Sequence, residues 1–193
     1  MSERAARPLR ADAERSVRVI LEAAERVLSM DPSASMEQIA TAAGVARTTI
    51  HRRFTHRQAL IDALASSAAR QLVQAVEEGR PGTAPPLVAL HRITANVLEV
   101  KGAWAFALGL PADPDSEAAA IHEDIGRRCI MVLERARADK LIDAAADLHW
   151  VRRVYYALLG ESLRGNPDDA GIDTDTLAAR IVDTLLHGAG PRA

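Results

Sequence analysis

Apolar positions along the chain recur with the period of an α-helix. After Asp12 the apolar stripe falls at i, i+3, i+4, i+7, i+10 and i+11, and it consists of Val17, Ile20, Leu21, Ala24, Val27 and Leu28. The pattern stops at Asp31-Pro32, because proline cannot continue a helix and restricts the residue before it. It predicts a first helix that begins near Asp12, preceded by a mobile, arginine-rich arm over residues 1–12.

Two short helices are expected next. Ser35 and Gln38 have the spacing of a capping box, in which each side chain bonds to the other residue's backbone N–H, and this predicts a helix over 36–43. Gly44 ends that helix where a positive φ is needed, and a further short helix is expected over 47–54. Two short helices joined by a tight glycine turn form a helix-turn-helix unit.

The rest of the chain keeps the helical period, interrupted by loops rich in Gly and Pro. The next expected helix is capped by Thr55 and ends at the loop that starts with Gly79. The later helices are expected at about 87–101, 104–110, 115–139, 144–164 and 174–187. Since β-branched and aromatic residues never alternate in strand-like runs, we expect an all-α protein of about nine helices.

These elements predict two domains. Residues 1–62 are expected to form a three-helix, helix-turn-helix DNA-binding domain with its flexible basic arm. Residues 63–193 are expected to form a second helical domain that carries the dimer face. The last two long helices carry more apolar surface than one core needs, which favours a dimer interface there.

Charge is unevenly distributed between the N-terminal segment and the rest of the chain. The formal net charge is 24 minus 26, or -2, yet residues 1–57 hold ten Arg and seven acids, which gives +3. Residues 58–193 hold the remaining 14 basic and 19 acidic residues, which gives -5. A basic N-terminal segment on an acidic body favours a nucleic-acid partner for that segment.

Several classes of protein are excluded by composition. No apolar stretch reaches the roughly 20 residues that a membrane helix needs, and the N-terminal segment lacks the apolar core of a secretory signal. The single cysteine, Cys129, can form neither an intrachain disulfide nor a cysteine-built zinc site. A cytoplasmic protein is therefore expected.

The second helix of the motif is expected to bury Ile50 and Phe54, while the small Ala40 lets the two helices approach. Its outward residues are hydrogen-bond donors, namely Arg47, Thr48, His51 and Arg52, with Thr49 at the margin of this face. Major-groove readers place base contacts at the N-terminal end of such a helix. An arginine-rich helix is often only a solvated face. The DNA-binding interpretation therefore depends on the coincidence of these donors with the capping box, the glycine turn and the basic flank.

Residues 13–62 resemble the TetR-type transcriptional regulators. The likeness is carried by three runs, Ile20-Leu21-x-Ala23-Ala24, Ile39-Ala40-x-x-Ala43-Gly44-Val45 and His51-x-x-Phe54-x-x-Arg57-x-x-Leu60. It implies an all-α homodimer that represses transcription at a palindromic operator on double-stranded DNA until a small-molecule effector, expected to be largely apolar, binds the C-terminal domain. By position it implies DNA contacts at Ser35, Arg47, Thr48, Thr49, His51, Arg52 and Arg57.

Within this set the resemblance implies phosphate contacts for Ser35, His51 and Arg57, and the arm residues Arg4, Arg7 and Arg10 are expected along the backbone or in a minor groove. Three positions depart from the family pattern. Ala46 replaces a small hydroxyl residue at the cap of the reading helix, at a cost of about 1 kcal/mol of local stability. Thr48 stands where Gly is common, and His51 stands where Tyr is common.

Candidate effector-pocket residues are few, because aromatics in an all-α body more often pack in the core. Those proposed to line a mainly apolar pocket with some polar groups are His91, Asn96, Trp104, Phe106 and Trp150. An effector-independent activator or architectural DNA-binding protein is the alternative, which a fully packed body would favour.

A helical enzyme is a further alternative that the motifs do not favour. None of the six histidines follows an acid by three residues or lies four residues from another histidine. The chain has no nucleophile elbow and no phosphate-binding glycine loop. We therefore expect no catalytic site, no metal and no cofactor.

Overall fold

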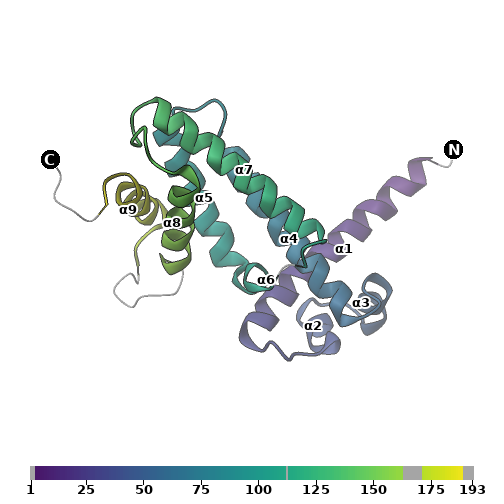
Figure 1. Cartoon of the computed structure of the whole chain (residues 1–193). Helices are drawn as coiled ribbons and strands as arrows, with labels where there is room; N and C mark the ends of the chain where they lie inside the picture. Colours follow the sequence, from purple (N-terminus) through teal and green to yellow (C-terminus); the bar gives the residue numbers. More distant parts are fainter. Residues whose placement is uncertain (1–2, 112, 163–170, 189–193) are drawn as a thin grey trace. The chain divides into compact units, whose positions relative to one another are not determined.

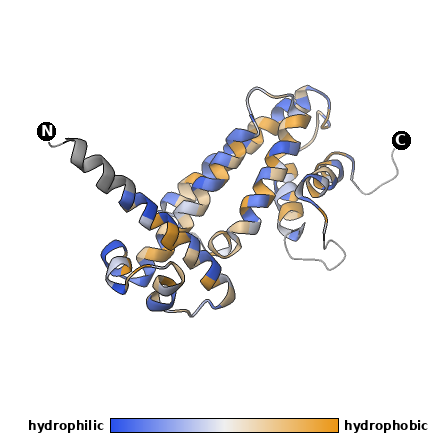
Figure 2. Cartoon of the chain, turned by 180° about the vertical axis from the view of Figure 1, so that it is seen from behind, coloured by the Kyte–Doolittle hydropathy of each residue, from blue (hydrophilic) through white to orange (hydrophobic). Residues whose placement is uncertain are grey.

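The computed structural model describes residues 3–111, 113–162 and 171–188. Within these ranges the chain forms nine helices and no strand, which confirms the all-α class (Figure 1). The helices are α1 (Glu3–Met30), α2 (Met36–Ala42), α3 (Arg47–Arg53), α4 (Arg57–Glu78), α5 (Pro86–Ala103), α6 (Ala105–Gly109), α7 (Glu117–Ala138), α8 (Leu148–Ser162) and α9 (Thr174–His187). Figure 2 shows that hydrophobic and hydrophilic positions share the same helices, as amphipathic helices require.

The chain divides into two compact units. The first unit comprises Met1–Ala68 together with Trp104–Ala112, and the second comprises Ala69–Ala103 together with Asp113–Ala193. The division falls inside α4. The short helix α6 belongs to the first unit, although its sequence neighbours α5 and α7 belong to the second.

The first unit is held by one apolar core. Side chains with less than 2% exposure come from α1, α2, α3 and α4, among them Ile20, Leu28, Ile39, Ile50, Leu60 and Leu64. Phe54, the residue that ends α3, is buried in the same core. The apolar positions that repeat at helical spacing in the sequence are therefore the ones that hold the helix-turn-helix motif together.

The first helix starts earlier than the sequence pattern predicts. α1 begins at Glu3 rather than near Asp12, so residues 3–12, which were expected to precede the helix, are part of it. This segment is rich in Ala and Arg, which are strong helix formers, although Pro8 in its second turn has no N–H to donate to the Arg4 carbonyl. The side chains of Arg4, Arg7 and Arg10 lie outside the described residues.

The residue that caps α4 also differs from expectation. His56, rather than Thr55, supplies a side-chain acceptor, since its Nδ1 accepts the Ala59 N–H at 3.1 Å. The helix accordingly begins at Arg57. A histidine ring nitrogen can satisfy an exposed helix N–H in the same way as a hydroxyl oxygen.

The second unit is tied together by polar contacts as well as by apolar packing. The buried Thr94 of α5 donates its hydroxyl hydrogen to Leu90 O at 2.6 Å, so Tyr155 of α8 donates to Thr94 Oγ1 at 2.7 Å. Arg135 of α7 donates to Pro81 O at 2.5 Å and Ala84 O at 2.7 Å. These bonds connect α5 to α8 and attach the loop between α4 and α5 to α7.

Gly79, where α4 gives way to that loop, is needed for close packing. A Cβ at this position would overlap Cγ1 of Ile93 and lie 3.1 Å from the Ile93 backbone nitrogen. We expect Gly79→Ala to lower the free energy of unfolding by about 1–3 kcal/mol, because the two backbones must separate. Urea unfolding followed by circular dichroism measures this change. Gly82→Ala is the control, because a Cβ there meets nothing within 4 Å, and equal stability of the two variants would contradict the prediction.

Candidate nucleic-acid interface

The turn between α2 and α3 is built as the sequence indicates. Ser35 Oγ accepts the Gln38 N–H at 3.2 Å, and Gln38 Oε1 accepts the Ser35 N–H at 2.7 Å, which completes the capping box of α2. Gly44 has a φ of +66°, the left-handed conformation that favours glycine. The Val45 N–H donates to Ala40 O at 3.0 Å and closes the turn. α3 is thereby presented at a defined angle to α2.

One face of α3 is left open to solvent. Arg47, Thr48, His51 and Arg52 are exposed and Thr49 is half-buried. On the opposite face Ile50 has no exposure. The five donors expected to contact DNA therefore share one helix, and four of them are accessible to a duplex. Ser35 is exposed at the start of α2.

A carboxylate that the sequence analysis missed lies beside these donors. Glu37 Oε1 of α2 is 2.8 Å from Arg47 Nη2 and 3.9 Å from His51 Nε2. Its own backbone N–H, followed by the charge of Arg47, holds the pKa of Glu37 below its usual value. The available signal was an acidic residue in the first turn of the first motif helix. A carboxylate has no hydrogen-bond donor, so the pattern of candidate DNA contacts does not include it.

Arg57 contacts the protein backbone. At the start of α4 its guanidinium donates to Ala34 O and, at 2.6 Å, to Pro32 O. These carbonyls lie in the turn between α1 and α2, directly before Ser35. Arg57 therefore holds the segment that presents Ser35, and its expected phosphate contact would use the donors of the guanidinium that remain.

The five residues proposed for an effector pocket are divided between the two units and make different contacts within them. His91 lies in a groove between α5 and α9, whereas Asn96 Nδ2 donates to Ala75 O of α4 at 3.1 Å. Trp104 and Phe106 pack against the core of the first unit. Trp150 is 57% exposed on α8. Sequence spacing could not separate these positions, because all five lie on helices or at their ends.

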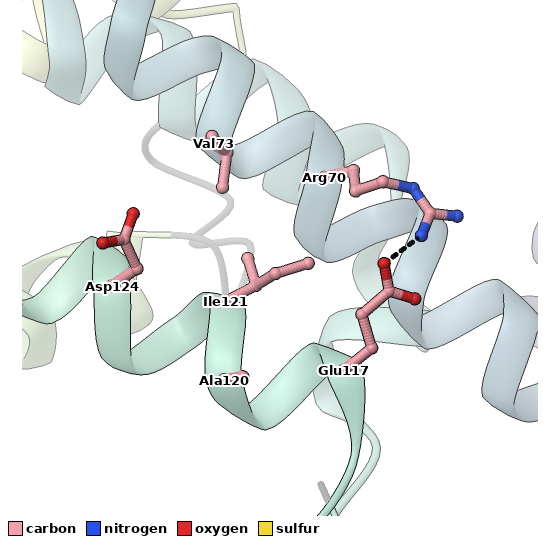
Figure 3. Close-up of a pocket in the computed structure, with 6 residues that line it drawn as sticks. All are labelled: Arg70, Val73, Glu117, Ala120, Ile121 and Asp124. Atoms are coloured by element: carbon pink, nitrogen blue, oxygen red, sulfur yellow. Dashed lines mark hydrogen bonds and ion pairs between the residues drawn. The ribbon is translucent and has the colours of Figure 1, made fainter.

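The second unit contains open grooves. Figure 3 shows one between α4 and α7, of about 430 Å³, with Val73, Ala120 and Ile121 forming its apolar part. Arg70 Nη1 and Glu117 Oε1, 2.7 Å apart, form an ion pair that joins its two walls. The groove that contains His91 also has a volume of about 430 Å³.

The described residues contain no group of three or more His, Cys, Asp and Glu side chains that could hold a metal ion. In the same part of the chain, no helix combines the length and apolar character needed to cross a membrane.

Cys129 of α7 is expected to react slowly. Burial raises the pKa of its thiol to about 11, although the Arg152 charge and a hydrogen bond with Tyr156 act in the opposite direction. At pH 8 only about one thiol in a thousand is then ionised, and the thiolate is the reactive form. We expect labelling by a disulfide reagent to be about 100-fold slower in the folded protein than in urea. Equal rates in the two conditions would contradict this expectation.

Comparison with known proteins identifies the family to which this motif belongs. Residues 20–64 match a sequence model described as "Bacterial regulatory proteins, tetR family". Over 179 residues the chain is 33% identical to the HTH-type transcriptional repressor LfrR of Mycolicibacterium smegmatis, covering 91% of this chain and 90% of that protein.

Solved structures agree in fold. The crystal structure of the TetR-like regulator LfrR from Mycobacterium smegmatis, in complex with proflavine, matches with a TM-score of 0.70 and 28% identity, over 93% of this chain and 99% of that one. The TetR family regulator PfmR from Thermus thermophilus matches with a TM-score of 0.77, over 89% of this chain and 99% of that one; at 18% identity it supports the fold alone. These relatives are transcriptional regulators.

Proposed function

Because the chain belongs to the TetR family of bacterial regulatory proteins and is a DNA-binding transcriptional regulator, we propose that it is a repressor that binds a palindromic operator as a homodimer. Each copy inserts α3 into a major groove, and a small molecule bound to the C-terminal domain releases the DNA. The domain boundary that we propose lies near residue 62, at the start of α4. A protein with this function works in the cytoplasm, where the chromosome lies.

The observation that carries the DNA-binding site is the open face of α3. Arg47 and Arg52 are suited to bidentate recognition of guanine, Thr48 and Thr49 are suited to neighbouring base or backbone contacts, and His51 is suited to a phosphate. Ser35 and Arg57 are proposed as further phosphate contacts, and Arg57 also holds the turn that precedes Ser35. Repression is supported by the relative LfrR, which is 33% identical and is described as a transcriptional repressor.

The homodimer is supported by apolar surface on α8. Trp150 and Tyr156 of α8 are 57% and 41% exposed, which leaves large rings for a partner to cover. A second copy also supplies a second reading helix, and two half-sites about 34–36 Å apart give specificity that one short helix lacks. A palindromic operator follows from the two-fold symmetry of such a dimer.

Effector binding is proposed for the second unit. Its support is the apolar part of the groove between α4 and α7, together with the proflavine complex of LfrR. The probe is therefore proflavine, added to a preformed complex of protein and operator. We expect it to lower the bound fraction. An unchanged fraction, with an unchanged melting temperature of the free protein, would contradict proflavine as an effector and favour the effector-independent alternative.

The experiment that tests the proposed function is selection of genomic fragments by the purified protein. We expect enrichment of an inverted repeat, bound by two copies of the chain. Absence of any enriched sequence would overturn the proposal.

A further inference from the structure

Glu37 is an acidic side chain beside an arginine and a histidine of α3. Its carboxylate lies 2.8 Å from Arg47 and 3.9 Å from His51, both on the exposed face of α3. The α2 cap does not require this side chain, because Ser35 and Gln38 complete the capping box between themselves. The ion pair with Arg47 connects the two helices of the motif.

Arg47 lies at an exposed helix start where few other groups fix its side chain. It is the first residue of α3, and the preceding Ala46 provides no side-chain hydrogen bond at the start of this helix. With 72% of its side chain exposed, the guanidinium has freedom to follow the nearest phosphate unless it is held. Glu37 offers an anchor on the neighbouring helix.

We propose that Glu37 is a positioning residue that determines specificity, by holding Arg47 for base reading and keeping it from non-specific phosphate contacts. This inference rests on the proposed function of α3 as the reading helix. The exposed ion pair is weak, so bidentate bonds to the correct base replace it readily. On an incorrect sequence Arg47 stays with Glu37, and the carboxylate itself repels the phosphate backbone.

The test compares wild-type protein with Glu37→Gln on two duplexes, the selected operator and a shuffled sequence of equal length. Glutamine keeps the size of the side chain and removes its charge. We expect the variant to bind the shuffled duplex about 5-fold more tightly, and the ratio of operator affinity to shuffled affinity to fall about 5-fold or more. Glu22→Gln is the control, because Glu22 is an exposed carboxylate of α1 and loses the same charge.

A second comparison separates positioning from simple charge. In an Arg47→Ala background, Glu37→Gln should change the ratio less than 2-fold, because the side chain that Glu37 positions is gone. The inference would be overturned if Glu37→Gln left the ratio of operator affinity to shuffled affinity unchanged in the wild-type background. It would also be overturned if the ratio fell equally in the Arg47→Ala background, or equally after Glu22→Gln. Failure of the wild-type protein to bind either duplex would instead overturn the proposed function, and this inference with it. Thermal melting of each variant verifies that the comparisons are made between folded proteins.

Discussion

Replacing Glu25 with alanine should lower the free energy of unfolding by about 3 kcal/mol or more. This carboxylate on α1 is 4% exposed. Its Oε1 accepts the Phe106 N–H at 2.8 Å and its Oε2 accepts the Ala107 N–H at 3.0 Å, so it satisfies two backbone donors at the start of α6. Hydrogen bonds to a charged group each contribute about 1.5–3 kcal/mol, and alanine leaves both donors without this acceptor.

Urea unfolding measures the loss, and amide exchange at Phe106 and Ala107 locates it. We expect both amides to exchange faster in Glu25→Ala. The control is Glu22→Ala, since Glu22 lies on the same helix with an exposed side chain. If Glu25→Ala and Glu22→Ala were equally stable, the carboxylate would have no role in holding α6 to the first unit.

Arg52→Ala should weaken binding to the operator about 10- to 100-fold, with little effect on a shuffled duplex. A good bidentate pair with guanine contributes about 1–3 kcal/mol of discrimination, and Arg52 is exposed on the reading face of α3. Arg47→Ala is expected to act in the same direction. Fluorescence anisotropy with labelled duplexes measures both affinities. A matched control is Arg127→Ala, an arginine of α7 in the second unit. An equal loss on both duplexes would contradict base reading by Arg52.

Arg57→Ala should behave differently. If Arg57 contacts a DNA phosphate as well as the protein backbone, its loss weakens binding to every sequence. It also reduces the slope of log affinity against log salt concentration by about one. Because its guanidinium also holds the carbonyls of Pro32 and Ala34, the melting temperature should fall too. Loss of stability with unchanged salt dependence would limit Arg57 to the structural role.

The sequence predicts the features of this fold that depend on local chemistry. The capping box at Ser35 and Gln38 and the positive φ of Gly44 each follow from residues within four positions of one another, and both are confirmed. The family resemblance in the first third of the chain is confirmed for the same reason, because the motif is short and continuous.

The features that escaped prediction join residues distant in sequence. Glu25 meets Phe106 across 81 positions, and Arg57 meets Ala34 across 23. Neither contact leaves a periodic signal. The candidate pocket residues illustrate the same limit, since Trp104 packs on the first unit whereas His91 lies in a groove of the second. Aromatic and polar residue types suggest a pocket, but only the fold determines which of them share a surface.

The central claim is that the exposed face of α3 reads a DNA sequence. Its most direct test is an equilibrium titration of the wild-type protein with the selected operator and with a shuffled duplex, repeated over a series of salt concentrations. We expect both affinities to fall as salt rises, and the operator to be preferred by about 1,000-fold or more at each concentration. Equal affinity for the two duplexes, or binding that does not respond to salt, would contradict it.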